Sequence, residues 1–194
     1  MKKNLIELNP SEQQLEKELR RRQLHRRQRA AFRSTVCILL IIGAAAVLAA
    51  TLWIPMFRIT GSSMEPLLKQ GQVVVAYRTT NLHIGDVAAF YYENQVLIKR
   101  VIAESGDWLD IDRQGNVFVN GDALEEEYLS EAVLGTTDLT YPYQVPDGCY
   151  FVMGDNRGVS MDSRMSTVGC ISQEKVAGKV LFRIWPIQQL EYIG

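Results

Sequence analysis

Ser63 lies in the run Gly61-Ser62-Ser63-Met64-Glu65-Pro66, where a glycine and a proline flank small hydroxyl residues. A serine hydroxyl attacks a carbonyl carbon efficiently only when a neighbouring base removes its proton. Histidine is the usual base, but the chain contains only His25 and His83. Lys99 lies in an apolar, strand-like segment further along. These residue types predict nucleophilic chemistry by a serine that a lysine activates.

Lys99 needs an unusual environment for this role. A lysine with its ordinary pKa of about 10.4 is neutral in only about one molecule in 2,500 at pH 7. In a strand, alternation places Lys99 on one face with Leu97 and Val101, and Arg100 on the other face. Burial disfavours the ammonium form and lowers the pKa of a lysine. A lone strand lysine more commonly extends to water, so the pairing with Ser63 carries this prediction.

Other candidates for the base or the nucleophile have weaker support. His25 lies in an arginine-rich run that precedes an uncharged apolar stretch, and His83 lies in a segment that reads as a connecting turn. Ser172 and Lys175 match the Ser-x-x-Lys pattern of penicillin-binding enzymes, but the accompanying Ser-Asp-Asn and Lys-Thr-Gly motifs are missing. We interpret that pair as a polar turn.

Charge divides the chain into a basic head and an acidic body. Residues 1–33 carry ten Lys/Arg against four Asp/Glu, whereas the chain after Ile54 carries eleven against eighteen. Ser34 to Ile54 is 21 residues without a charge, and a helix of that length, roughly 31 Å, matches the thickness of a bilayer core. We predict a basic helical segment at 1–33, opened by Ser11 with Gln14 as its capping partner, and a transmembrane anchor at 34–54.

The anchor has topological consequences. Alanine clusters inside the apolar stretch would also suit a cleavable signal peptide, but the long head and long apolar core favour an uncleaved anchor. Lysine and arginine resist translocation across a membrane. We therefore predict a single-pass protein of the cell membrane, with its N-terminus in the cytoplasm and its body, residues 55–194, outside the cytoplasm. The basic head then faces anionic membrane lipid, and no nucleic acid partner is expected.

The body reads as an antiparallel β domain, so the predicted fold class is mainly β on a single N-terminal transmembrane helix. Short apolar runs alternate with Gly, Asn and Asp, and Asn120-Gly121 is the strongest hairpin signal. Periodicity fades over residues 122–146, which predicts a looped insertion there. The predicted strands are Gln72–Tyr77, Val87–Tyr92, Val96–Ala103, Trp108–Asp112, Val117–Asn120, Cys149–Met153 and Lys175–Trp185.

A third polar run, Met153 to Arg164, is dense in groups that can hydrogen-bond and pair charges around a site. A calcium loop is the alternative, but Arg157 and Val159 occupy positions where an EF-hand needs oxygen ligands. No cysteine or histidine cluster has metal-ligand spacing, so neither a metal nor another cofactor is expected. Cys149 and Cys170 can form a disulfide or remain two small apolar residues.

In these motifs and their order the chain resembles the type I signal peptidases, the membrane-bound serine–lysine leader peptidases of bacteria. The resemblance runs from the apolar stretch through Gly61–Pro66, Ile98–Ile102 and Gly154–Arg164 to Gly178-Lys179. It implies endoproteolysis of exported preproteins after small residues at the first and third positions before the cut.

The resemblance also implies a role for individual residues. Ser63 is the nucleophile, Lys99 is the general base, and Ser160 orients the lysine amine. The implied structural supports are Asp155, Asp162 and Arg164, and the implied substrate-binding residues are Met64, Ser62 and Gly61.

The chain departs from the family pattern at a few positions. Gly61 stands where some members have a serine whose hydroxyl completes the oxyanion hole, which leaves the Ser63 backbone N–H with less help. Leu67 replaces a common threonine, and Gly158-Val159 replaces the usual Asp-Asn pair before Ser160. None of these changes removes a catalytic atom.

Two alternative functions remain open at this point. A self-cleaving, repressor-type serine–lysine protease uses the same chemistry, but it would be soluble and carry a DNA-binding helical domain. A catalytically inactive, membrane-tethered binding protein is the alternative from another class. The intact Ser63 and Lys99 argue against the second, and the apolar anchor argues against the first.

Overall fold

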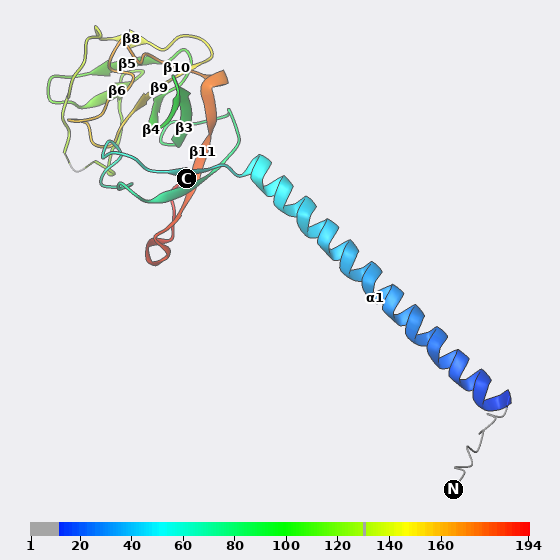
Figure 1. Ribbon diagram of the computed structural model, residues 1–194. Coiled ribbons are helices and arrows are strands. Elements are labelled where there is room, and N and C mark those ends of the chain that lie inside the picture. The colour runs from blue at the N-terminus through cyan, green and yellow to red at the C-terminus, as the bar shows by residue number, and fades with distance from the viewer. Residues whose placement is uncertain (1–11, 130) are drawn as a thin grey trace. The chain divides into compact units, whose positions relative to one another are not determined.

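The structure is a computed structural model that describes residues 12–129 and 131–194. The chain divides into two units, with the boundary between Ala50 and Thr51. The first unit is helical and the second is a β domain (Figure 1).

The helical unit contains most of α1, a single 42-residue helix from Glu12 to Trp53 whose last three residues, 51–53, fall in the second unit. Residues 20–48 of α1 contain an 18-residue window of mean hydropathy 2.2, long and apolar enough by composition to cross a membrane. The helix ends shortly before Pro55, since a residue that precedes proline avoids the helical conformation. Residues 12–33 of the predicted basic head are helical, whereas its first eleven residues, with the predicted cap at Ser11, lie outside the described residues.

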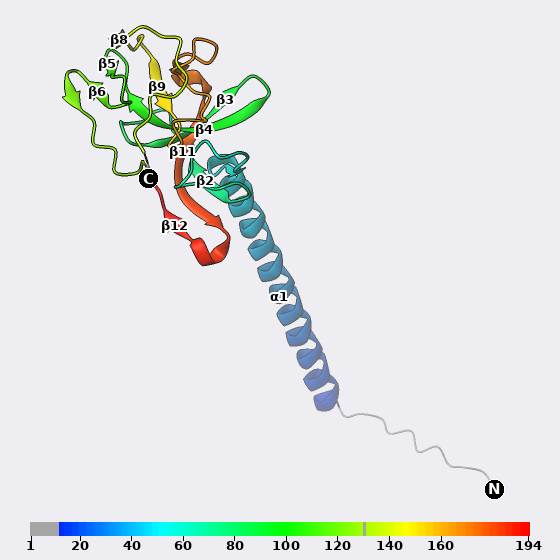
Figure 2. The same cartoon turned by 90° about the vertical axis from the view of Figure 1, so that its left-hand side faces the viewer.

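The β domain is built from short antiparallel strands, which confirms the predicted fold class (Figures 1 and 2). Two 3-10 turns, η1 (Gln173–Lys175) and η2 (Ile187–Gln189), flank the longest strand. The strands are β1 (Met56–Arg58), β2 (Val73–Tyr77), β3 (Val87–Tyr92), β4 (Gln95–Ala103), β5 (Trp108–Ile111), β6 (Val117–Val119), β7 (Asp122–Ala123), β8 (Tyr143–Gln144), β9 (Cys149–Met153), β10 (Ile171–Ser172), β11 (Val176–Trp185) and β12 (Glu191–Tyr192).

The strands form two sheets. The larger sheet has the order β1-β2-β11-β3-β4-β9-β10, with β12 added to β11, and the smaller sheet has the order β7-β6-β5-β8. Strand β11 pairs with β2, β3 and β12, so it joins the N-terminal and central strands of the larger sheet. Strands β3 and β4 form a hairpin in which Ala88 pairs with Lys99.

All seven predicted strands occur within a residue or so of their predicted ends. The hairpin at Asn120-Gly121 is also confirmed, because both residues have positive φ, 55° and 92°, as a tight primed turn requires. The strands that sequence analysis missed are two or three residues long, too short for a period-2 pattern to appear: β1, β7, β8, β10 and β12.

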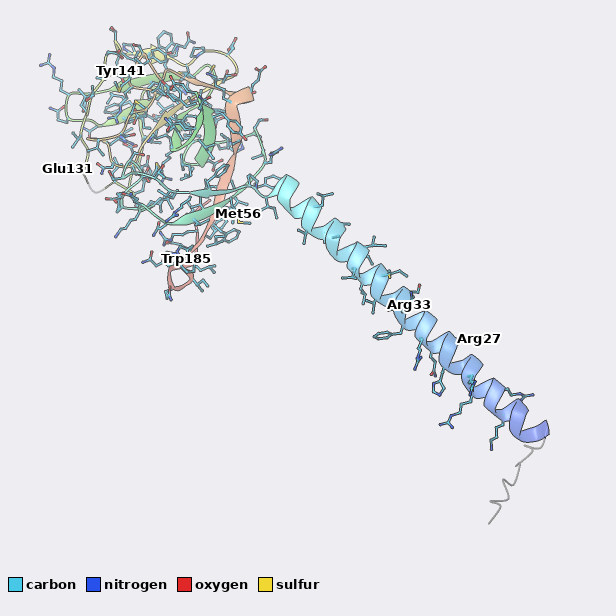
Figure 3. The ribbon with its side chains drawn as sticks, viewed as in Figure 1. Arg27, Arg33, Met56, Glu131, Tyr141 and Trp185 are labelled. Carbon is cyan, nitrogen blue, oxygen red and sulfur yellow. The ribbon has the colours of Figure 1, made fainter. Side chains whose placement is uncertain are left out.

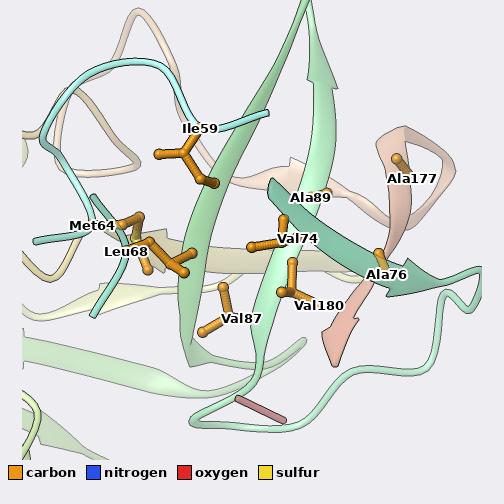
Figure 4. Close-up of a cluster of buried hydrophobic side chains, with 9 residues drawn as sticks. All are labelled: Ile59, Met64, Leu68, Val74, Ala76, Val87, Ala89, Ala177 and Val180. Atoms are coloured by element: carbon orange, nitrogen blue, oxygen red, sulfur yellow. The ribbon is translucent and has the colours of Figure 1, made fainter. Parts of the chain in front are cut away.

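One hydrophobic cluster fixes the segment that carries Ser63 (Figure 4). Val74 and Ala76 point inward from β2, while alternate residues of that strand face outward. Met64 and Leu68, which follow Ser63 in the chain, are buried in the same cluster. Burying two such side chains contributes about 1.5–3 kcal/mol each and holds the Ser63 turn against the sheet.

Gly178→Ala should destabilise the β domain. A Cβ atom at Gly178 would lie 2.5 Å from the carbonyl oxygen of Tyr77 on the neighbouring strand, so the backbone of β2 or β11 would have to shift. We expect the free energy of unfolding to fall by about 1–3 kcal/mol in a denaturant titration. The matched control is Gly158→Ala, whose Cβ meets no atom and which should stay within about 0.5 kcal/mol of wild type. Equal stability of the two variants would contradict this account of the sheet.

Candidate active site

Ser63 is held by backbone hydrogen bonds on both sides of its turn. Glu65 N donates to Ser62 O at 3.1 Å, and Leu68 N donates to Met64 O at 2.8 Å. Asn156 N, from the run Met153–Arg164, donates to the carbonyl oxygen of Ser63 itself at 3.0 Å. Two segments that are more than ninety residues apart in the sequence thus meet at the nucleophile.

Lys99 meets Ser63 directly. The Lys99 Nζ atom lies 2.5 Å from Ser63 Oγ, and the lysine is only 3% exposed. Burial lowers the pKa of Lys99 from 10.5 to about 8. The carboxylates of Asp162 and Asp155 raise this pKa and so limit the shift, whereas the Arg164 guanidinium adds to it. An amine with a pKa of about 8 is neutral in roughly one molecule in ten at pH 7, which makes it usable as a base.

The competing candidates lie elsewhere. His83 is exposed, and its Nδ1 atom lies 3.4 Å from a carboxylate oxygen of Glu104. Ser172 caps η1, and its Oγ accepts a hydrogen bond from Glu174 N, so the Ser172–Lys175 pattern belongs to a surface turn. Lys99 is therefore the base candidate that contacts Ser63.

The supports predicted from the resemblance are buried ion pairs. Arg100, on the opposite face of β4 from Lys99, donates two hydrogen bonds to Asp155, at 2.9 and 2.7 Å. Burial raises the pKa of Asp155, although Arg100 opposes the shift. Asp162 pairs with Arg164 at 2.8 Å, and both side chains are completely buried. Burial also favours a higher pKa for Asp162, but Arg164 and the Gly154 N–H hold it below its usual value.

Ser160 is buried beside this network, and no hydrogen bond joins its hydroxyl to Lys99 among the described residues. Its hydroxyl helps to lower the pKa of Asp162, yet it forms no hydrogen bond of ordinary geometry. A Cβ atom placed on Gly154 would lie 2.3 Å from Ser160 Oγ and 2.4 Å from Ser63 O, so the three residues are closely packed. The orienting role of Ser160 stays a prediction, with its hydroxyl available but unpaired.

Sequence analysis did not single out two residues that complete the network. Glu126 accepts hydrogen bonds from both terminal nitrogens of the buried Arg157 guanidinium. Tyr128 places its ring 3.8 Å from the Arg100 guanidinium carbon, and its hydroxyl donates to Glu126 at 2.7 Å. Both lie in the aperiodic region 122–146, where the Glu125-Glu126-Glu127 run reads as ordinary solvent-exposed charge.

A groove of about 300 Å³ opens beside the Ser63–Lys99 pair. One wall is β1 and the segment that follows it to Met64, and the other wall is residues 95–99 of β4. Strand β4 pairs with β9 only from Arg100 onward, and β1 pairs only with β2. Both walls therefore present backbone edges that are not paired with a strand. Gly61 and Met64 line this groove, whereas Ser62 is exposed and does not line it.

The cysteines of the β domain are not joined. Cys149 and Cys170 are both free and partly buried, and both pack against the cluster beneath the smaller sheet. Cys170 Sγ lies 3.5 Å from the Tyr143 hydroxyl. Within residues 12–129 and 131–194, no three side chains of His, Cys, Asp or Glu gather in a group that could hold a metal ion.

Comparison with known proteins identifies the family. The family described as "Signal peptidase, peptidase S26" matches residues 32–185. Signal peptidase IB of Staphylococcus aureus (strain MRSA252) is 35% identical over 156 residues, covering 70% of this chain and 80% of that protein. The chloroplastic thylakoidal processing peptidase 1 of Arabidopsis thaliana is 33% identical over 145 residues, covering 66% of this chain and 41% of the relative.

A crystal structure of a signal peptidase I from Enterococcus faecalis V583 is 30% identical, covers 51% of this chain and 96% of that chain, and superposes with a TM-score of 0.42. The chain belongs to the S26 family of signal peptidases, and its function is that of a type I signal peptidase. This confirms the resemblance found in the sequence and favours signal peptidase over a self-cleaving repressor.

Removing Glu126 should destabilise the domain strongly. Glu126→Ala leaves the buried Arg157 guanidinium without its carboxylate, and breaking a buried pair in this way typically costs about 3–5 kcal/mol. Glu125→Ala, at an exposed neighbouring position, is the matched control and should change the free energy of unfolding by less than about 0.5 kcal/mol. Thermal and urea unfolding of both variants measure the difference, and similar values would show that the Glu126–Arg157 pair does not stabilise the fold.

Proposed function

We propose that this signal peptidase cleaves preproteins with Ser63 as the nucleophile and Lys99 as the general base. The observation that carries the proposal is the 2.5 Å contact between Lys99 Nζ and Ser63 Oγ, at a lysine whose pKa is lowered to about 8. Neither property alone would suffice. A fully charged lysine cannot accept a proton even when it contacts the serine. A neutral lysine that lies away from the serine cannot reach the hydroxyl proton.

The reaction proceeds in two halves. Ser63 Oγ attacks the carbonyl carbon of the scissile peptide while Lys99 Nζ takes the hydroxyl proton. The resulting ammonium returns a proton to the leaving amine as the C–N bond breaks, and the leader stays attached to Ser63 as an acyl-enzyme. Lys99, neutral again, then deprotonates a water that hydrolyses this ester and frees Ser63.

The negative oxygen of the tetrahedral intermediate needs donors. Among the described residues, the backbone N–H of Ser63 has no hydrogen-bond partner, so it is available for this oxygen. Gly61 supplies no hydroxyl at the position where some family members have serine. We therefore assign the main oxyanion contact to the Ser63 N–H.

The leader part of the substrate fits the groove between β1 and β4. An extended peptide can hydrogen-bond to unpaired strand edges, and both walls offer such edges beside Ser63. Ile59, Met64 and Ile98 give the groove apolar walls, which suit small apolar side chains before the cut. Gly61 and Met64 remain substrate-binding candidates as groove residues, and Ser62 remains one as the neighbour of the nucleophile.

We assign the membrane anchor to residues 34–54, with the basic segment 1–33 in the cytoplasm and the body 55–194 outside. The uncharged part of α1 and the arginines that precede it, including Arg27 and Arg33 in Figure 3, support this topology. The S26 family implies preproteins as substrates, and cleavage outside the cytoplasm matches their route of export. The boundary of the looped insertion at 122–146 stays a prediction alongside these segments.

An exposed apolar sheet face supports work at a membrane surface. Met56, Val75, Phe182 and Tyr192 are register partners in one row across β1, β2, β11 and β12. All but Val75 are more than 40% exposed, and the nearby Trp185 is 54% exposed. Strand β1, which contributes Met56 to this row, begins three residues after the end of α1 in the sequence.

Ser63→Ala and Lys99→Ala should each abolish preprotein cleavage while the domain stays folded. The two residues act as one unit, so the double variant should lose no more activity than either single variant. The assay incubates detergent-solubilised protein with a preprotein and sequences the new N-terminus, and circular dichroism checks the fold. Near-normal turnover by either variant would exclude the serine–lysine mechanism, and an inactive wild type would favour the binding-protein alternative.

The rate should rise with pH as Lys99 loses its proton. Because the neutral amine is the active form, kcat/KM for a peptide substrate should increase through an apparent pKa near 8 and then level off. His83→Ala should leave this limb in place, since His83 is exposed and contacts Glu104. Disappearance of the limb in His83→Ala would transfer the role of base to that histidine.

Ser160→Ala tests the proposed positioning of the lysine amine. The buried, unpaired hydroxyl of Ser160 is free to accept or donate a bond to Lys99 once substrate binds. We expect kcat to fall by about ten- to a thousandfold with little change in KM, a smaller loss than in Lys99→Ala. Ser160→Thr, which retains the hydroxyl, should recover part of the rate. Unchanged kcat in Ser160→Ala would remove Ser160 from the mechanism.

A further inference from the structure

A second hollow, of about 420 Å³, is lined by the residues that follow Met64 in the chain. It lies between the residues that follow Ser63, the loop at 131–133, where Figure 3 labels Glu131, and the turn that follows β9. Its lining residues are Glu65, Pro66, Lys69, Glu131, Val133 and the run Asp155–Gly158.

The position of this hollow relative to Ser63 suggests its use. The groove is lined by Ser63 and Met64, and the second hollow starts at the next residue, Glu65. The two hollows share no lining residue. Asn156 lines the second hollow and donates its N–H to the Ser63 carbonyl oxygen at 3.0 Å. Ser63 thus lines the groove and is hydrogen-bonded to a residue that lines the second hollow, and an endopeptidase must bind its substrate on both sides of the cut.

The two hollows differ in chemistry. The charged side chains that line the groove, Arg58 and Lys99, are both basic, whereas the second hollow is also lined by the carboxylates of Glu65, Glu131 and Asp155. Asp155 and Arg157 are already paired, with Arg100 and Glu126 respectively. Within the described chain, Glu65, Lys69 and Glu131 make no ion pair, so two carboxylates and one ammonium remain to meet a ligand.

A third hollow, of about 460 Å³, continues the path. It shares Pro66 and Lys69 with the second hollow and adds Glu127 to its lining, whereas its arginine, Arg183, is paired with Glu191. Glu127 also lacks an ion-pair partner in the part of the chain that the structure describes. Three unpaired carboxylates and one ammonium along this path give it a net negative charge.

We propose that the second hollow binds the first residues of the mature protein, immediately after the cut. The proposal rests on the proposed function, with the leader in the groove. The carboxylates that line the second hollow, and that the groove lacks, give the two sides of the cut different charge environments. The unpaired Glu65 and Glu131 carboxylates favour basic over acidic side chains at the second and third mature positions, so this hollow adds a charge preference to the cleavage.

The test uses two peptides that share one leader and one cleavage site. They differ only at the second and third positions after the cut, with Lys-Lys in one peptide and Glu-Glu in the other. For the full chain in a non-ionic detergent at low salt, kcat/KM should be about three- to tenfold higher for the Lys-Lys peptide, the range expected for partly exposed charge pairs. The ratio should shrink at 0.5 M salt because the charges are screened.

Variants assign the preference to the second hollow. Glu65→Gln combined with Glu131→Lys should remove or reverse the ratio. Glu174→Lys, on the exposed turn η1, is the matched control and should keep it. A further pair of peptides carries Lys or Glu two residues before the cut, a position that lies in the groove. The kcat/KM ratio of this pair should be the same in wild type, in the double variant and in Glu174→Lys.

The outcomes separate this proposal from the proposed function. Equal rates for the two peptides in wild type, or an unchanged ratio in the double variant, would overturn the proposal while cleavage itself continues. A change in Glu174→Lys as large as in the double variant would also overturn it, because the effect would then come from overall charge. Failure to cut either peptide, or cutting by Ser63→Ala, would instead contradict the proposed function.

Discussion

The buried amine of Lys99 is the constraint that organises the catalytic domain. Burial disfavours an ammonium at this position, and the amine lies in contact with Ser63 Oγ, whose proton it would accept in the proposed mechanism. The nearby Asp162 and Asp155 carboxylates keep the pKa from falling further. A fully apolar pocket would produce a weaker base, and an exposed pocket would produce a charged one. In the proposed mechanism, Lys99 can act as the base because burial and the neighbouring charges bring its pKa to about 8.

Strand β4 connects the chemistry to the scaffold. Alternation places Lys99 toward the serine and Arg100 toward Asp155, so one strand supplies both the proposed base and an ion pair that holds the turn after β9. The turn after β9 also holds Ser63, because the Asn156 N–H donates a hydrogen bond to the Ser63 carbonyl oxygen. Arg100, Arg157 and Arg164 are each buried with a carboxylate partner, and losing that partner would leave the guanidinium charge uncompensated.

Sequence analysis could predict the features that a short stretch of sequence determines. Ser63 and Lys99 were identifiable because histidine is scarce and because a lysine in an apolar strand is unusual. The longer strands followed from period-2 alternation. Glu126 and Tyr128 were not predictable, because their importance comes from contacts with Arg157 and with Arg100 across an aperiodic loop. Short strands such as β1 were missed for a related reason, since pairing with β2 rather than intrinsic preference defines them.

The most direct test of the central claim is a titration of Lys99 itself. The chain has seven lysines, and labelling them with carbon-13 at Cε allows each amine to be followed by NMR across pH 6 to 11. One resonance should titrate near pH 8, and it should be the one that disappears in Lys99→Arg. If the Lys99 resonance instead titrated near 10.4, the ordinary value for a lysine, the buried lysine could not serve as the base, and the account of the site would be wrong.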